Sequence, residues 1–248
     1  TEDAHGRNVA IGHKALEDLN AGAEGYNVAV GYNAGLNVST GTENTIMGGL
    51  AGDTLTTGAR NVAIGYHALG GEDAHGKNVA IGYQALKAQD AGADAYNVAI
   101  GYSTGENIST GVQNVLMGGK AGDALTTGGY NVAIGHEALS AEDGHGKNVA
   151  IGWQALSDQN AGADAFNIGI GYNAGKAMTT GIRNVIMGGL AGDALNTGSN
   201  NIAIGYEALT TEDGNGRNIA IGTNSLQNLN AGSDAYNVAV GFASGAAM

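Results

Sequence analysis

A five-residue phrase, Asn-Val-Ala-Ile-Gly at residues 8–12, occurs fourteen times in this chain of 248 residues, either identically or as a close variant. Successive copies begin 19, 17, 17 and 17 residues apart before the series starts again, so a short period lies inside a period of 70 residues. Such repeats are too short for a helical hairpin, which needs about 33 residues. A short β-branched run closed by Gly instead fits one coil of a β-solenoid. The sequence therefore predicts an all-β solenoid, of the β-roll or β-helix kind, with about fourteen coils of 17–19 residues.

The repeats also predict the domain organisation. Each coil of a solenoid contacts mainly its neighbours, so residues 1–248 are expected to form a single elongated domain. Its super-repeats are 8–77, 78–147, 148–217 and 218–248, of which the last is partial. Because residues 1–6 match residues 211–216, the chain opens in the middle of a repeat. We therefore expect it to be a segment of a longer fibre protein.

Each coil is numbered here from its Asn, which is position zero. Stacked Asn side chains are expected to hydrogen-bond along the solenoid axis and to satisfy backbone groups at the corner, as a structural ladder. Position four is Gly in every copy, as a sharp corner requires. The predicted ladder consists of Asn8, Asn27, Asn44, Asn61, Asn78, Asn97, Asn114, Asn131, Asn148, Asn167, Asn184, Asn201, Asn218 and Asn237.

Both alternating faces of the predicted strands are apolar. We expect positions one and three to face the core, which places position two on the other side, where it is never charged. Either the return segment of the same coil or a second chain would then cover that other face; we favour the second chain and expect a homotrimer. In the third coil of each super-repeat, position three is Met47, Met117 or Met187, predicted to be core. Its bulky position two is expected to be compensated by Gly at position five, where most other coils have an aromatic residue.

The charge and composition exclude several partners. A net charge of −13 disfavours nucleic acid and anionic bilayers. No run of eighteen apolar residues occurs, so membrane insertion is not predicted. The chain has no Cys, and hence neither disulfides nor thiolate metal sites.

Candidate chemistry is sparse. His5, His75 and His145 follow Glu and Asp in the fourth-coil return, and a trimer would bring three such His together as metal ligands; solvated turn residues are the simpler interpretation. Acidic Gly-rich returns are an alternative site for calcium, although the Gly-Gly-x-Gly-x-Asp motif of calcium-binding β-rolls is absent. No carboxylate pair differs from its repeated copies, so no enzymatic activity, catalytic residue, cofactor site or metal site is predicted.

The residue before each Asn carries two further features. Six of the ten basic residues lie there, and ion pairing across the local return explains them. After the long first-coil return the same place is aromatic, and these rings either pack on the coil below or stack on a receptor sugar. The candidate receptor contacts are Tyr26, Tyr96, Phe166 and Tyr236.

The phrase at Asn61–Leu69, Asn-Val-Ala-Ile-Gly-Tyr-His-Ala-Leu, resembles the Asn-Thr-Ala-Ile-Gly repeats of bacteriophage tail-fibre and virion structural proteins. More distantly, it is similar to the β-roll heads of YadA-like trimeric autotransporter adhesins, whose repeats are shorter. The resemblance covers essentially the whole chain. It implies a homotrimeric fibre segment that presents a receptor-binding surface, and it carries no catalytic residues.

These observations predict a non-enzymatic structural and adhesive segment of a phage tail fibre or virion appendage, located on a virion or at a cell surface. Its expected partners are other copies of itself, as a homotrimer or end to end, and a host-surface receptor such as a glycan. The alternatives are a bacterial trimeric adhesin or self-assembling extracellular filament, and an ice-binding solenoid that uses its Thr-Gly rows.

Overall fold

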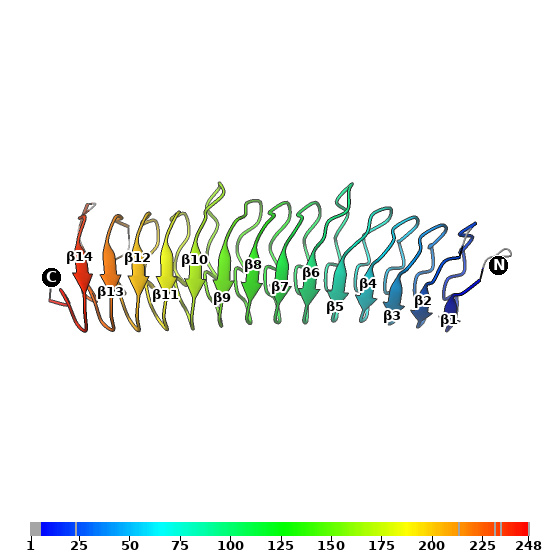
Figure 1. Cartoon of the computed structure of the whole chain (residues 1–248), viewed down its shortest axis with the longest axis horizontal. Coiled ribbons are helices and arrows are strands. Elements are labelled where there is room, and N and C mark those ends of the chain that lie inside the picture. The colour runs from blue at the N-terminus through cyan, green and yellow to red at the C-terminus, as the bar shows by residue number, and fades with distance from the viewer. Residues whose placement is uncertain (1–5, 23, 213, 231, 234, 248) are drawn as a thin grey trace. The chain divides into compact units, whose positions relative to one another are not determined.

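The computed structural model describes residues 6–22, 24–212, 214–230, 232–233 and 235–247, and divides into two compact units, Thr1–Gly128 and Gly129–Met248. Every regular element in the described residues is a strand of three residues (Figure 1). The first unit contains β1 (Val9–Ile11), β2 (Val28–Val30), β3 (Thr45–Met47), β4 (Val62–Ile64), β5 (Val79–Ile81), β6 (Val98–Ile100) and β7 (Val115–Met117). The second contains β8 (Val132–Ile134), β9 (Val149–Ile151), β10 (Ile168–Ile170), β11 (Val185–Met187), β12 (Ile202–Ile204), β13 (Ile219–Ile221) and β14 (Val238–Val240).

Within each unit, every strand pairs in parallel with the next strand along the chain. Positions one, two and three lie opposite the same positions of the neighbouring coil, as in Val79↔Val98, Ala80↔Ala99 and Ile81↔Ile100. The return segments also bond coil to coil: Ser39 N–H donates to the Thr56 carbonyl at 2.8 Å, and Gly35 N–H to that of Ala51 at 2.9 Å. Each unit is therefore a β-solenoid, and the predicted fold class is confirmed.

The Gly corner ends each strand for a steric reason. Gly82 has φ +136°, and a Cβ added to it would lie 2.1 Å from the carbonyl oxygen of Gly101 in the next coil. No side chain fits at that distance, so position four must be Gly if the corners are to stack.

Residues other than Gly also adopt left-handed backbone conformations at the turns of each coil. Gln84 at position six, Leu86 at position eight and Tyr96 before the next Asn have φ of 54°, 49° and 54°. The same three places recur with positive φ in the other coils, occupied by Gly or by ordinary residues. Each residue other than Gly costs about 1–2 kcal/mol at these places, and the hydrogen bonds between coils offset that cost.

The core contradicts the expected strand orientation. Ala80, at position two of β5, is 0% exposed, whereas Val79 and Ile81 at positions one and three are partly exposed. The interior consists of positions two, seven, eight and eleven, as in Ala80, Ala85, Leu86 and Gln89. The prediction that positions one and three form the core is wrong, because the return segment packs against the small Ala row and leaves the larger side chains outside.

Two predictions about the third coil fail for the same reason. Met47, Met117 and Met187 are 41%, 39% and 38% exposed, so the Met row is not core. The bulky residue at position two is buried, but the Gly that makes room for it is at position eight of the preceding, second coil. The Cδ1 atom of Ile46 lies 2.9 Å from where a Cβ on Gly35 would sit. Gly49 at position five faces outward instead, 3.6 Å from the Tyr66 ring by the same measure.

Candidate functional site

The Asn row forms a continuous polar ladder inside each unit. The side-chain Oδ1 of each Asn accepts a hydrogen bond from the backbone N–H of the next Asn in the row, at 2.9 Å from Asn44 to Asn27 and 2.8 Å from Asn114 to Asn97. The Nδ2 of Asn97 donates to the Gly111 carbonyl at 2.7 Å and to Gln89 Oε1 at 2.6 Å. These bonds tie adjacent coils together and satisfy a buried corner, which is a structural role.

In three of the first coils the Oδ1 bond of the ladder is formed, but the Nδ2 bond is missing. Asn78, Asn148 and Asn218 have buried Nδ2 atoms without a hydrogen-bond partner. In the coils with 17-residue spacing, the acceptor is the carbonyl fourteen residues onward, such as His75 O for Asn61 at 3.2 Å. The first-coil return is two residues longer, and the equivalent bond is not formed.

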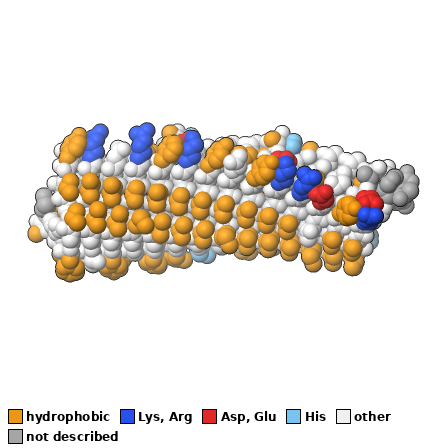
Figure 2. All heavy atoms as spheres, in the orientation of Figure 1, with side chains coloured by type: hydrophobic (Ala, Val, Ile, Leu, Met, Phe, Trp, Pro, Cys, Tyr) orange, Lys and Arg blue, Asp and Glu red, His pale blue; other side chains and the backbone are white. Residues whose placement is uncertain are grey.

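The outward face of the strands is an apolar surface. Positions one and three are Val, Ile, Met or Thr in all fourteen copies, and none of these residues is buried. Figure 2 shows the hydrophobic side chains in regular rows over the strands of each unit. Strands about 4.8 Å apart make this face roughly 30 Å long in each unit of seven strands. Contiguous apolar surfaces of this size are uncommon on monomeric proteins, so this face is a candidate interaction surface.

A second exposed row borders this face at position five. Tyr66, Tyr83 and Tyr102 stack in succession, with ring centroids 5.6 and 5.2 Å apart. In the second unit Trp153 stacks on Tyr172 at 5.1 Å. All five rings are roughly half exposed. The Gly at position five of the third coil interrupts the row once in each of the three complete super-repeats.

The predicted receptor contacts Tyr26, Tyr96, Phe166 and Tyr236 form a separate, roughly half-exposed row. Each ring is approached by a cation from the preceding coil: Arg7, Lys77, Lys147 or Arg217, at 5.0–5.6 Å from the ring centroid. The Lys77 Nζ also donates to the Tyr96 hydroxyl at 3.0 Å. One face of each ring thus has a cation partner, and the ring keeps exposed surface beside it.

Arg7, Arg60, Lys77 and Lys147, which precede an Asn, form ion pairs with an adjacent coil, which corrects the predicted local pairing. Lys77 Nζ lies 2.5 Å from Asp94 Oδ2 in the next coil, and not on Asp73 of its own turn. Lys147 pairs with Asp164 in the same way. The hydrogen bonds from these lysines lower the pKa of Asp94 and Asp164 below its ordinary value.

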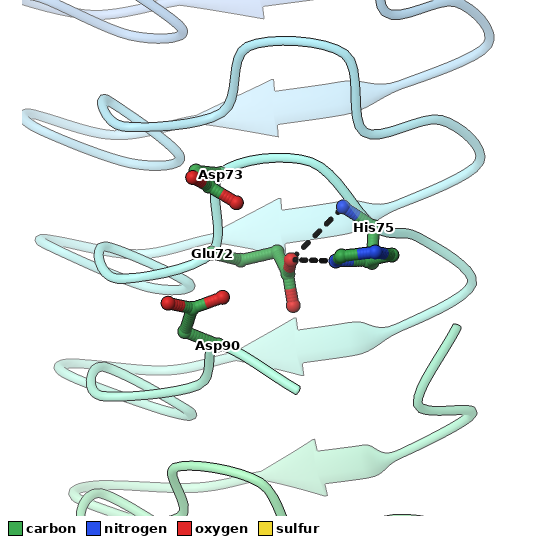
Figure 3. A group of neighbouring side chains, drawn as sticks. All are labelled: Glu72, Asp73, His75 and Asp90. Atoms are coloured by element: carbon green, nitrogen blue, oxygen red, sulfur yellow. Dashed lines mark hydrogen bonds and ion pairs between the residues drawn. The ribbon is translucent and has the colours of Figure 1, made fainter. Parts of the chain in front are cut away.

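The fourth-coil return carries a cluster of acidic and His residues. The ligand atoms of Glu72, Asp73, His75 and Asp90 all lie within 4.8 Å of one another (Figure 3). Glu142, Asp143 and His145 form a second such group in the second unit. Burial raises the pKa of Glu72 and Glu142 above its ordinary value. Of the predicted His row, His5 lies outside the described residues.

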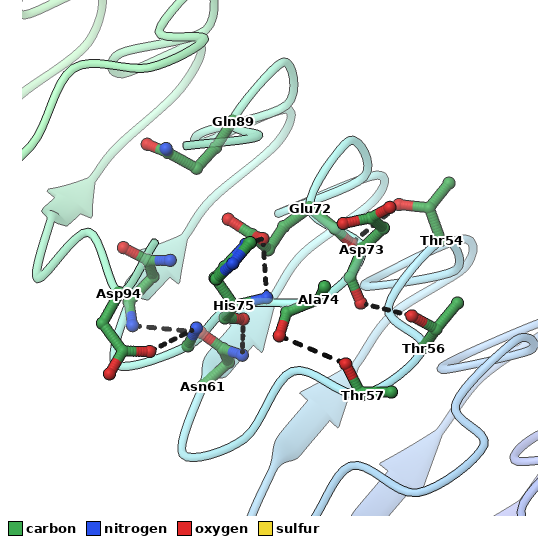
Figure 4. Close-up of polar contacts among 12 residues, drawn as sticks. Thr54, Thr56, Thr57, Asn61, Glu72, Asp73, Ala74, His75, Gln89 and Asp94 are labelled. Carbon is green, nitrogen blue, oxygen red and sulfur yellow. Dashed lines mark hydrogen bonds and ion pairs between the residues drawn. The ribbon is translucent and has the colours of Figure 1, made fainter. Parts of the chain in front are cut away.

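Polar contacts from both neighbouring coils hold this return in place (Figure 4). The Thr56 hydroxyl donates to the Asp73 carbonyl at 2.9 Å, and the Thr57 hydroxyl to the Ala74 carbonyl at 3.3 Å. On the other side, Gly76 N–H donates to Asp94 Oδ1 at 3.1 Å. The third coil and the next first coil therefore position the cluster.

Sequence reasoning missed two of these features. The position-five rings are visible in the sequence as aromatic residues after the Gly corner, but only the orientation of the strand shows that they are exposed. Glu72, Glu142 and Glu212 lie at position eleven, where the other described coils have Leu, Val, Ile, Met or Gln. Aligning the coils on their Asn would have identified these acids as occupants of a core position.

No pocket is found among the described residues, and none of them belongs to a helix long and apolar enough to cross a membrane. Comparison with protein-family models, curated proteins and solved structures gives no significant match.

Proposed function

We propose that this chain is a non-enzymatic structural and adhesive segment of a fibre, of the kind found in phage tail fibres and virion appendages, and that it trimerises through its outward apolar face. The observation that carries the proposal is the pair of rows at positions one and three, which are apolar or Thr in every coil and lie outside the solenoid. Such a face has no partner within its own coil.

A second copy of the chain fits this face better than an unrelated partner. Its rows repeat every 4.8 Å or so, and an identical face has the same spacing, so side chains of two copies can interdigitate along their length. The net charge of −13 opposes association elsewhere on the surface. Positions one and three carry no charge, so this face is where copies can approach.

The adhesive part of the proposal rests on the exposed aromatic rows. Sugar rings present apolar faces that stack on aromatic side chains, and Tyr96 and its equivalents are held by cations at one face while staying half exposed. Four coils separate Tyr26 from Tyr96, which places such rings on the order of 19 Å apart along a unit. A host-surface glycan with repeated sugars would match that spacing.

The mass of the purified chain in solution tests the assembly. A homotrimer gives three times 24.6 kDa by light scattering or native mass spectrometry at micromolar concentration. Introducing charge on the face with Ile100→Lys and Ile170→Lys should give a monomer with an unchanged circular dichroism spectrum. The control Asn107→Lys places the same charge on an exposed return and should remain trimeric.

A monomeric wild-type chain would contradict the proposed assembly, and a ladder of masses would favour an end-to-end filament instead. The adhesive role has a separate test on a glycan array. Tyr96→Ala should weaken binding of the responding glycan, while Tyr66→Ala, which removes an exposed ring of the position-five row, should leave binding unchanged. Equal binding by both variants would remove the Tyr96 row from the contact.

A further inference from the structure

The fourth coil places a carboxylate in the solenoid core. Glu72 and Glu142 occupy position eleven and are 0% exposed, whereas the same position holds the fully buried Leu55 and Leu125 in the third coils. A buried carboxylate is costly unless hydrogen bonds, an opposite charge or a metal ion compensates it. The contacts of these two acids show how much of this cost the protein's own hydrogen bonds and charges offset.

One buried oxygen of Glu72 and one of Glu142 form no hydrogen bond, although the Ala161 backbone also stabilises the charged form of Glu142. Glu72 Oε1 accepts a hydrogen bond from the backbone N–H of His75 at 3.0 Å, while its Oε2 is buried and bonded to nothing. His75 Nδ1 is also buried without a hydrogen bond, 3.6 Å from Glu72 Oε1. Glu142 and His145 repeat the arrangement, with the backbone bond at 3.1 Å and the ring nitrogen at 3.8 Å. Two potential ligand atoms thus converge in each unit.

Two further carboxylates complete the first cluster. Asp73 lies on the same return as Glu72, and Asp90 comes from the next coil, so that three oxygen ligands and one nitrogen ligand lie within 4.8 Å of one another (Figure 3). Zinc takes four such ligands at about 2.0–2.2 Å in a tetrahedron. Asp73 and Asp90 are exposed and can rotate inward to close that distance. Three carboxylates also supply the negative charge that favours a dication.

The return at residues 211–216 stabilises its position-eleven carboxylate, that of Glu212, in a different way. Asn215 stands where His75 and His145 stand, and both its backbone N–H and its Nδ2 donate to Glu212 Oε1 at 3.0 Å. A side-chain amide therefore compensates the carboxylate there. Asn is thus compatible with the fold at this place, and only the copies with His offer an imidazole nitrogen as a metal ligand.

We propose that Glu72, Asp73, His75 and Asp90 bind a zinc-type divalent cation that joins the fourth coil to the coil after it, and that Glu142, Asp143 and His145 form a weaker second site. The second site is weaker because Asn160 replaces Asp90, which removes one anionic ligand. The imidazole nitrogen favours zinc over calcium, which prefers oxygen ligands only. This inference is independent of the proposed fibre function.

Zinc titration of the chelator-treated chain by isothermal calorimetry, with the His imidazoles followed by NMR, tests the site. Wild-type protein should bind zinc, shift the His75 and His145 resonances and gain thermal stability. His75→Asn with His145→Asn copies the third return, so it should fold normally and lose about 100-fold or more in zinc affinity. Glu72→Gln with Glu142→Gln should do the same, because Gln89 and Gln159 occupy position eleven elsewhere.

The matched control is His13→Asn, which removes an exposed imidazole that stacks on Tyr32 away from either cluster. Its zinc affinity should equal that of the wild type. Three results would overturn the proposal: no saturable zinc binding by the wild-type chain, equal affinity in the His75→Asn, His145→Asn variant, or tighter binding of calcium than of zinc.

Discussion

The inside and the outside of the same three-residue strands differ in a way that explains much of this molecule. Ala80 points inward and is fully buried, while its neighbours Val79 and Ile81 point outward and stay partly exposed. The larger apolar side chains are on the outside, the reverse of an ordinary solvated sheet. The interior is kept narrow by small residues, and the bulkier outward rows are left for another surface.

The largest effect is expected from breaking the interior ladder. Asn97→Ala removes the Oδ1 acceptor of Asn114 N–H and the donor to Gln89 and Gly111. Leaving several buried polar groups unpaired should lower the free energy of unfolding by about 4 kcal/mol. Urea denaturation measures it. Asn107→Ala removes one exposed bond to the Asp123 carbonyl and should cost about 0.5 kcal/mol; equal losses would mean that the interior ladder has no special role.

A smaller loss is expected from overfilling the interior row. At Gly169, the equivalent of Ala99 in the next super-repeat, an added Cβ would lie only 2.6 Å from Leu156 Cγ. Ala99→Leu should therefore destabilise the chain by about 3 kcal/mol. The adjacent outward change Val98→Leu should alter stability by less than about 0.5 kcal/mol. Similar thermal melts for the two variants would contradict the inward orientation of position two.

The buried carboxylates and the exposed, lysine-paired carboxylates should make the stability depend on pH with opposite signs. Burial raises the pKa of Glu72 and Glu142 above 4.5, so their contribution is most favourable below pH 4.5 and is lost as the pH rises through the folded pKa. Lysine pairing lowers the pKa of Asp94 below 3.8, so that contribution is present above pH 3.8 and is lost as the pH falls.

Urea unfolding of chelator-treated protein across pH 3–8 measures both contributions. Glu72→Gln with Glu142→Gln should reduce the decline in stability above pH 4.5. Asp94→Asn should instead reduce the loss of stability at acidic pH, and by less, because the pair is exposed. An unchanged profile in the Gln variant would show that the buried acids carry no such penalty.

The smallest effect is expected from changes at position six, where the backbone of the turn is left-handed. Gln84 has φ 54°, which Gly adopts without strain. Gln84→Gly should stabilise the chain by up to about 1 kcal/mol, while the β-branched Gln84→Val should destabilise it by about 1–2 kcal/mol. Thermal unfolding of the two variants provides the comparison. Destabilisation by Gly would mean that the left-handed turn is not strained.

Of the candidate sites, the sequence located the aromatic row at Tyr96 and the His row at His75, because both recur at 70-residue intervals. It did not show that a cation from the preceding coil approaches Tyr96, or that Asp90 joins His75. Those contacts cross between coils, and the axial stacking of return loops determines them. The resemblance to fibre proteins bears on function and stays an expectation.

The sequence by itself determined the coil, its length and its corner, because a repeated chain must place equivalent residues in equivalent environments. It could not determine which face of the strand is inside. Val79, Ala80 and Ile81 are all apolar, so no polar residue in the strand indicates which of its two faces meets solvent. Only the tertiary structure decided this, since the inward face is the one whose small side chains let Leu86 and the rest of the return pack against it.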